Sequence, residues 1–222
     1  MPIRHAIWRV AAHPLPLAES SLPTEQLLED MIVASPQIVS AEWMLIGRQE
    51  DTGLGGRIDL LAVAPDGSLV LIELKRNRTP REVVAQALDY ASWVEALDAQ
   101  HIAAIYGRFA PARNLAADFH TRFGQELDDD SLNQNHQIVI VASSLDDSSE
   151  RIVAYLNERD IPINVLCFQV FSNGAEQLLS RAWLLDPALT QINAGIKDGS
   201  TEPWKQVVGW VQSRSGQSTT SR

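Results

Sequence analysis

The sequence predicts an α/β fold, and three features of the chain lead to this prediction. Segments with the two-residue alternation of strands follow segments with helical periodicity along most of the chain. The 222 residues, of which 45% are hydrophobic, are enough to bury one full core, so we expect one domain with small additions. The longest apolar runs have the length of strands, and the sequence therefore predicts no membrane span.

The first half of the chain is expected to contain one helix and a group of strands. A short strand at His5–Val10 and a proline-containing loop come before a helix at Thr24–Ala34, which Pro36 ends. Three strands are expected next, at Glu42–Arg48, Arg57–Ala64 and Ser68–Lys75. The turn signal Pro65-Asp66-Gly67 joins the last two, which predicts a hairpin.

The second half is expected to continue the alternation of helices and strands. Thr79 and Glu82 form a capping-box pattern around Pro80, which predicts a helix from Thr79 to Leu97. The elements expected after it are a strand at His101–Tyr106, a helix at Ala110–Thr121, a strand at Gln137–Ala142, a helix at Ser148–Arg159 and a strand at Ile163–Val170. We expect an N-terminal strand-and-loop extension (1–20), a main domain (21–172), a small helical C-terminal appendage (173–212) and a disordered tail (213–222).

Composition and motifs exclude several classes of function. A formal net charge of −10 argues against a general polycationic nucleic-acid binder. The single cysteine, Cys167, allows no internal disulfide and, without a signal-peptide pattern, favours a cytoplasmic location. The glycine-rich loop at 53–56 precedes a strand instead of opening a helix, which argues against dinucleotide binding. No nucleophile-elbow motif occurs, and the five histidines lack the spacing of metal ligands.

The predicted hairpin brings acidic side chains together. If its turn is symmetric about Asp66, Asp59 lies opposite Glu73 on the neighbouring strand, with their Cβ atoms about 4.5–5.5 Å apart. Lys75 shares the face of Glu73, whereas Leu74 points into the core. Two adjacent carboxylates among apolar neighbours repel each other, and a hard divalent cation such as Mg²⁺ removes this conflict.

Each candidate side chain near this pair also has a simpler interpretation. Asp59, Glu73 and Lys75 are also compatible with a self-satisfied salt-bridge cluster, although the strand context favours a metal site. Glu25 and Glu29 share one face of the first helix, and either is a candidate third carboxylate. For Glu29 we favour a solvated helix face.

Polar and basic residues follow the hairpin. Gln86 and Tyr90 lie one helical turn apart, and Gln86 is either a group that orients water or phosphate or a surface amide. Four positive charges occur among residues 75–81, the densest basic cluster in the chain, which is either a charged loop or a docking surface for a phosphodiester backbone.

These residues resemble the pattern of the PD-(D/E)XK nuclease superfamily, and most closely the catalytic domain of NucS/EndoMS-type DNA endonucleases. The pattern is carried by Glu25, by Asp59 after Gly56-Arg57-Ile58, by Glu73-Leu74-Lys75 and by Gln86. The resemblance covers residues 21–172 and implies a restriction-endonuclease-like, three-layer α/β/α fold with a mixed central sheet. Position 58 is Ile where the superfamily name has Pro, and only about twenty residues stand in place of the N-terminal domain of NucS enzymes.

The resemblance implies a DNA endonuclease that depends on Mg²⁺ or Mn²⁺. Asp59 and Glu73 would bind the metal, Glu25 would assist as a further ligand, Lys75 would act on the attacking water and the phosphate, and Gln86 would support the site. The residues expected to contact nucleic acid are Arg57, Arg76, Arg78, Arg81 and Tyr90. DNA is the expected partner, a homodimer is suggested by analogy, and a further DNA-binding protein is a possible partner.

A second class of function fits the same sequence. A nuclease fold without catalytic activity would serve in DNA binding or protein assembly, and the net charge of −10 favours this alternative. The complete set of acidic residues and lysine favours the nuclease.

Overall fold

The computed structural model describes residues 4–53, 55–79 and 81–187, and it shows the predicted α/β fold as a mixed sheet between helices. The strands are β1 (Trp8–Arg9), β2 (Leu15–Pro16), β3 (Ala18–Ser20), β4 (Met44–Asp51), β5 (Arg57–Val63), β6 (Leu69–Thr79), β7 (His136–Leu145), β8 (Ile163–Asn173) and β9 (Glu176–Trp183). The helices are α1 (Glu25–Ala34), the short 3₁₀ helix η1 (Pro36–Ile38), α2 (Glu82–Glu95), α3 (Ala99–Phe109), α4 (Leu115–Phe123) and α5 (Asp147–Asn157).

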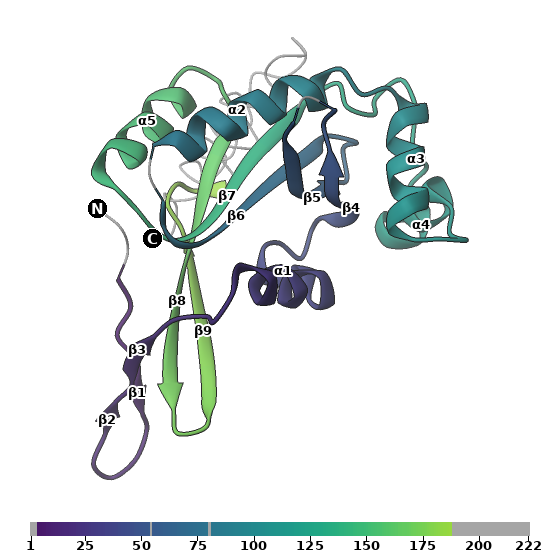
Figure 1. Cartoon of the computed structure of the whole chain (residues 1–222). Helices are drawn as coiled ribbons and strands as arrows, with labels where there is room; N and C mark the ends of the chain where they lie inside the picture. Colours follow the sequence, from purple (N-terminus) through teal and green to yellow (C-terminus); the bar gives the residue numbers. More distant parts are fainter. Residues whose placement is uncertain (1–3, 54, 80, 188–222) are drawn as a thin grey trace, which may run out of the picture.

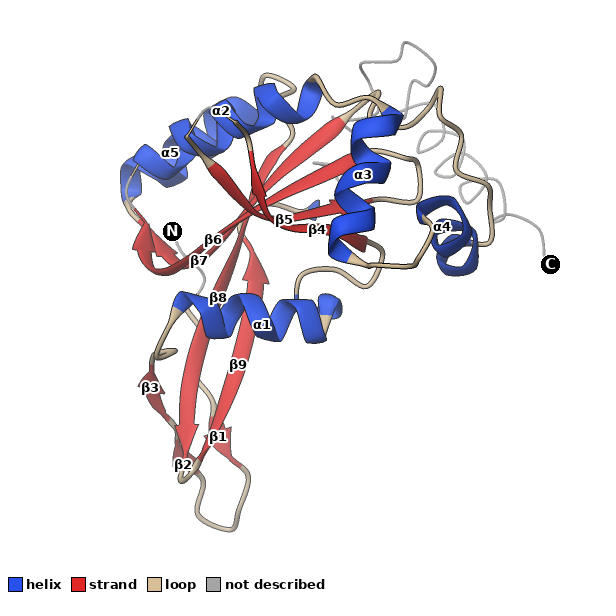
Figure 2. Cartoon of the chain, turned by 45° about the vertical axis from the view of Figure 1, so that its right-hand side comes forward, coloured by secondary structure: helices blue, strands red, loops and turns tan. Residues whose placement is uncertain are grey.

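The main sheet has the order β3-β8-β7-β6-β5-β4, with β9 also paired to β8. Strands β6, β7 and β8 are parallel to one another, and the remaining pairs are antiparallel, so the predicted mixed sheet is confirmed. Figures 1 and 2 show α1 on one side of the sheet and α2 and α5 on the other. This arrangement gives the expected three layers.

Each face of the sheet has its own hydrophobic core. Leu28 and Ile32 of α1 pack with one set of strand residues, whereas Val83 of α2, Ile105 of α3 and Val153 of α5 pack with the other. Strand residues alternate between the two cores because successive side chains point to opposite faces. The central strands are therefore apolar on both faces, and a charged side chain within them is exceptional.

The start of α1 agrees with its prediction, whereas the start of α2 differs. Thr24 caps α1, since its Oγ1 accepts the N–H of Leu27 at 3.1 Å. Helix α2 begins at Glu82 with Arg81 in the cap position and no side-chain capping bond, so the capping box expected at Thr79 is wrong. Strand β6 continues to Thr79, so this residue is the last of the strand and does not cap the helix.

The strand predicted at His101–Tyr106 is also wrong, because these residues form α3. Asp98 caps this helix by accepting the N–H of His101 at 2.8 Å. Ile102 and Ile105 are both buried, three residues apart, as on one face of a helix. The apolar run that contains them is short, so its pattern alone fits a strand as well as a helix. The helix expected at Ala110–Thr121 is found at a later position, as α4.

The C-terminal prediction fails where it can be compared. Residues 176–183 form strand β9, which pairs with β8 from Leu166 to Asn173, instead of a helix. The expected boundary at 172 therefore falls inside β8, one residue before that strand ends. The rest of the helical segment from 188 and the predicted disordered tail at 213–222 lie outside the described residues.

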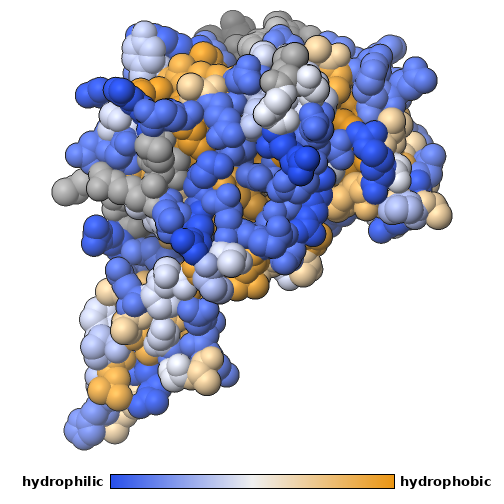
Figure 3. All heavy atoms as spheres, in the orientation of Figure 1, coloured by the Kyte–Doolittle hydropathy of each residue, from blue (hydrophilic) through white to orange (hydrophobic). Residues whose placement is uncertain are grey.

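Strands β8 and β9 extend beyond the helices as an arm that also carries β1, β2 and β3 (Figure 1). This arm holds most of the exposed large hydrophobic residues in the described part of the chain, namely Trp8, Val10, Leu15 and Leu178. Figure 3 shows apolar and polar residues mixed on the arm, and a mostly hydrophilic surface over the body. None of the described helices has the length and apolar character needed to span a bilayer.

Candidate active site

The candidate site lies at the open end of the β5–β6 hairpin. The predicted register is confirmed near the turn, where Leu61 pairs with Leu71. The backbone pairing stops before the expected pair of Asp59 and Glu73. Instead, Asp59 Oδ2 accepts a hydrogen bond from the backbone N–H of Leu74 at 2.8 Å. A side-chain carboxylate is thus the acceptor where a regular sheet would have a backbone carbonyl.

Glu73 is a buried carboxylate in a strand between two apolar cores, with 1% of its surface exposed. Its Oε1 accepts a hydrogen bond from Lys75 Nζ at 2.5 Å, whereas its Oε2 is buried and has no hydrogen-bond partner. Burial, and then the negative charge of Asp59, raise the pKa of Glu73 to about 7. The electrostatic conflict expected between the two carboxylates is therefore present in the fold.

Asp59 and Lys75 respond to the same environment. Burial raises the pKa of Asp59, although the N–H of Leu74 and the charge of Lys75 oppose this rise. Burial alone would lower the pKa of Lys75, but the hydrogen bond and charge of Glu73 raise it overall. Lys75 is therefore a charged donor at neutral pH.

Glu25 reaches the edge of this site from α1. Its Oε2 accepts the backbone N–H of Arg76 at 2.9 Å, one residue after Lys75. Its charge is close enough to contribute to the raised pKa values of Asp59 and Glu73. The structure thus brings Asp59, Glu73 and Lys75 together, and Glu25 lies at the edge of this group, bonded to the backbone of Arg76.

Glu29 is buried, so its interpretation as part of a solvated helix face is wrong. It is 4% exposed and accepts hydrogen bonds from Arg48 Nε at 2.7 Å and from Gln49 Nε2 at 3.0 Å. Gln49 Nε2 also donates to Asp59 Oδ1 at 3.1 Å. Arg48 and Gln49 were not predicted as site residues. The available signal was the polar run 48–51 at the end of an apolar strand.

Gln86 and Tyr90 hold the start of β5 from α2. Gln86 Nε2 donates to Tyr90 Oη at 2.8 Å, and the backbone N–H of Arg57 donates to the same oxygen at 3.1 Å. The Tyr90 ring is buried against Gly56, where a Cβ would meet it at 2.3 Å. These two side chains thus support the strand that carries Asp59. Contact of Tyr90 with nucleic acid and a catalytic role for Gln86 stay predictions.

The predicted basic residues are spread around the site. The Arg57 side chain is exposed, and the Arg81 side chain is exposed beside Glu82. The Arg76 guanidinium donates to the carbonyl of Pro23, which ties β6 to the segment before α1. The Arg78 side chain lies outside the described part of the structure. Their contact with nucleic acid stays a prediction.

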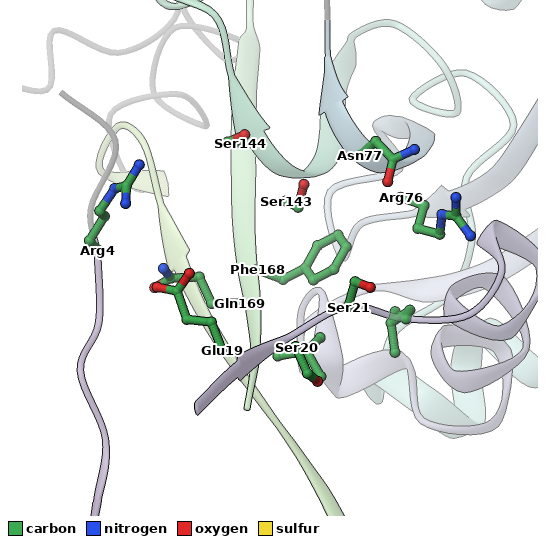
Figure 4. Close-up of a pocket in the computed structure, with 12 residues that line it drawn as sticks. Arg4, Glu19, Ser20, Ser21, Arg76, Asn77, Ser143, Ser144, Phe168 and Gln169 are labelled. Atoms are coloured by element: carbon green, nitrogen blue, oxygen red, sulfur yellow. The ribbon is translucent and has the colours of Figure 1, made fainter. Parts of the chain in front are cut away.

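A polar cavity of about 310 Å³ opens beside Arg76 at the carboxyl end of the parallel strands. Its lining includes Arg4, Glu19 and hydroxyl groups of Ser143 and Ser144. In Figure 4, Arg4 and Arg76 lie on opposite sides of the cavity, with Phe168 between them. The cavity lies between the arm and the end of β6, next to the backbone that holds Glu25.

The donor set at the site fits a hard divalent cation. Glu73 Oε2 is a buried oxygen without a hydrogen-bond partner, and Asp59 is the carboxylate whose negative charge raises the pKa of Glu73 most. No group of three or more His, Cys, Asp or Glu side chains that could hold a metal occurs among the described residues. Mg²⁺ is commonly bound by one or two carboxylates, with waters and substrate phosphate completing its shell. Asp59 and Glu73 would supply two such carboxylates, whereas Glu25 forms no three-carboxylate metal group with them in the structure.

A comparison with known protein families agrees with the resemblance seen in the sequence. Residues 24–113 match the family described as "Endonuclease NucS C-terminal domain", which confirms the similarity to NucS for that part of the chain. No curated protein matches the chain.

Solved structures matched by part of this chain include a repair endonuclease from Pyrococcus abyssi, with 18% sequence identity and a TM-score of 0.40 over 62% of this chain and 46% of that one. An EndoMS complex with double-stranded DNA has 15% identity and a TM-score of 0.38 over 68% of this chain and 61% of that one. EndoMS in its apo form has 16% identity and a TM-score of 0.36 over 68% of this chain and 60% of that one. The similar region spans less than two thirds of each of these proteins.

Proposed function

We propose that this protein is a metal-dependent DNA endonuclease. Hydrolysis would add the oxygen of a water to a backbone phosphorus, break one phosphorus–oxygen ester bond and pass a proton to the departing sugar oxygen. Asp59 and Glu73 would hold Mg²⁺ or Mn²⁺, with Glu25 as an assisting carboxylate at the edge. When bound, the ion would supply Lewis acidity and lower the pKa of a water ligand.

The residues of the chain would perform distinct tasks in this reaction. Lys75 is charged at neutral pH, so it would donate to a phosphate oxygen and stabilise the negative charge that develops there. Glu73 must lose its proton to bind a cation, and its pKa of about 7 makes this step depend on pH in the neutral range. Gln86 and Tyr90 would keep Asp59 in place through the start of β5.

The observation that supports the proposal most strongly is the environment of Glu73. A carboxylate that is 1% exposed, with one oxygen lacking a hydrogen-bond partner and a second carboxylate nearby, is costly for the fold. Perturbed pairs of this kind cluster at functional sites. The match of residues 24–113 to the NucS C-terminal domain and the polar cavity beside Arg76 also support a phosphodiester substrate.

A cleavage assay tests the proposal. Purified protein would be incubated with a mixture of single-stranded, duplex and branched DNA in Mg²⁺, Mn²⁺ or EDTA. We expect cleavage that requires the metal and falls at least about 100-fold in Glu73→Gln and in Lys75→Ala. Glu95→Gln, which changes an exposed carboxylate on α2, is the matched control and is expected to retain activity. Absence of cleavage with every substrate, in protein shown to be folded, would contradict the proposal.

The alternative is a nuclease-like module that binds DNA or assembles with proteins without cleaving. The net charge of −10 favours it, because an acidic domain binds DNA weakly at physiological salt. A DNA-binding partner or a homodimer would supply the missing affinity. DNA retention without metal-dependent cleavage would support this alternative.

A further inference from the structure

Gln49 has a backbone conformation that is unusual for its side chain. Its φ is 53°, in the left-handed region that favours glycine. In a regular strand, Arg48 and Gln49 would point to opposite faces of the sheet. Here both side chains reach the carboxylate of Glu29 on α1. The left-handed conformation therefore turns Gln49 toward α1, next to Arg48.

This turn places the Gln49 amide between two carboxylates. Its Nε2 donates to Glu29 Oε2 at 3.0 Å and to Asp59 Oδ1 at 3.1 Å. Because both partners are acceptors, the nitrogen and not the amide oxygen must face them. Glu29 is itself fixed, since Arg48 Nε donates to its other oxygen at 2.7 Å. The bonds form a continuous chain from Arg48 through Glu29 and Gln49 to Asp59.

The same chain determines the orientation of Asp59. Leu74 N–H holds Oδ2 at 2.8 Å, and Gln49 holds Oδ1. With one protein donor on each oxygen, the carboxylate is restrained against rotation, and each oxygen keeps further acceptor capacity. Mg²⁺ requires near-ideal geometry, so a ligand with a fixed orientation binds it at a lower entropic cost.

We propose that Gln49 is a positioning residue for Asp59, which it fixes for metal binding by tethering it to the buried Glu29 of α1. This inference rests on the proposed function, since it assigns Asp59 as a metal ligand. The backbone strain at Gln49 is the cost of directing its side chain to the site, and strain of this kind is found where surrounding structure imposes a functional geometry. Glu29 and Arg48 are the anchor of this tether.

The experiment uses Gln49→Gly, which removes the amide and suits a positive φ. Gln49→Ala removes the amide but keeps the strain, and Gln177→Ala is the matched control, since it removes an exposed amide on the arm that bonds to Ser20 and Ser21. The readouts are melting temperature without metal, Mn²⁺ affinity by calorimetry, and kcat and KM for DNA cleavage. A purely structural residue would lower the melting temperature when removed.

We expect Gln49→Gly to keep or raise the melting temperature, by up to about 2–4 °C, because strain is relieved. We expect the Mn²⁺ affinity of Gln49→Gly to fall about 10- to 100-fold, because removal of a residue that orients a metal ligand usually has an effect of this size. kcat should fall with KM for DNA unchanged, and Gln49→Ala should lose the same affinity. Glu29→Gln combined with Gln49→Gly should lose little more than Gln49→Gly alone, because both act through one tether.

Two outcomes separate the inference from the proposed function. If wild type binds Mn²⁺ and cleaves DNA while Gln49→Gly binds Mn²⁺ within twofold of wild type, the positioning role is wrong and the nuclease stands. If the folded wild type neither binds Mn²⁺ nor cleaves, the proposed function fails and the positioning role fails with it. NMR of the metal-free protein provides an independent test. If the side-chain amide of Gln49 is freely mobile, the tether between Gln49 and Asp59 does not exist and the inference is wrong.

Discussion

The two ends of the β5–β6 hairpin use the same pair of strands in different ways. At the turn end, Leu61, Val63, Leu69 and Leu71 are completely buried, and Ser68 N–H finds an acceptor in Asp66 at 3.0 Å. At the open end, the strands stop pairing, and charged side chains replace the leucines. The turn end has the buried apolar side chains and paired backbone of a stable sheet. The open end, a few residues away, has buried charges and no backbone pairing between the two strands.

The difference indicates which end of the hairpin stabilises the fold and which end destabilises it. Burial of apolar side chains stabilises the turn end. At the open end, Glu73 Oε2 lacks a hydrogen-bond partner, and Gln49 of the neighbouring strand β4 carries backbone strain. These costs fall on a proposed metal ligand and on the residue proposed to position one, as expected where function competes with stability. Removal of a buried leucine at the turn end and removal of the buried charge of Glu73 at the open end should therefore change the free energy of unfolding with opposite signs.

The largest change is expected at the turn end. Leu71 is fully buried near the start of β6, so Leu71→Ala should lower the free energy of unfolding by about 2–5 kcal/mol through lost burial and a cavity. Denaturant unfolding followed by circular dichroism measures this change. A loss below about 1 kcal/mol would mean that the turn end is not the stabilising part of the hairpin.

The next largest effect is expected at Glu73, with the opposite sign. The pKa of Glu73 is about 7 in the folded protein against an ordinary value of 4.5, so the folded state binds this proton more tightly than the unfolded state. Stability from this group is therefore complete below pH 4.5 and is lost as the pH rises through 7. Glu73→Gln should raise the stability of the metal-free protein at pH 8 by about 2–3 kcal/mol.

The pH dependence provides the control for that variant. Between pH 5.5 and pH 8, wild type should lose more stability than Glu73→Gln, because the variant has no carboxyl to ionise at this position. Parallel stability curves for the two proteins over this range would contradict the raised pKa. Thermal unfolding at several pH values in EDTA gives both curves.

A comparable but smaller effect is expected where α2 meets the start of β5. Gly56→Ala would place a Cβ 2.3 Å from the Tyr90 ring, so it should cost about 1–3 kcal/mol of stability. Gly107→Ala in α3 is the matched control, because nothing lies within 4 Å of its added Cβ. Its stability should rise by about 0.5–1 kcal/mol through helix propensity. Equal effects at both glycines would show that the Tyr90 contact is not close.

The turn end of the hairpin was predictable from the sequence for a physical reason. Pro65-Asp66-Gly67 and the two-residue alternation around it fix the register, since a slip by one residue would expose the whole apolar set. The same register predicted the proximity of Asp59 and Glu73, although the side-chain bond from Asp59 to Leu74 N–H replaces the expected backbone pair.

Other parts of the site were not predictable from local pattern. The alternation rule fails at Gln49, because one left-handed residue turns its side chain to the same neighbour as Arg48. Glu29 looked like a surface residue because its partners come from β4, which lies twenty residues later in the chain. Helix α3 was predicted as a strand because a short apolar run fits both periods, and only Asp98 signals a helix start.

The most direct test of the account is titration of metal-free protein with Mn²⁺ at pH 8, measured by calorimetry for wild type, Glu73→Gln and Asp59→Asn. Binding of one ion by wild type, with affinity reduced at least about 100-fold in each variant, is the predicted result. If all three proteins bind Mn²⁺ equally or not at all, the two carboxylates at the open end of the hairpin do not form a metal site.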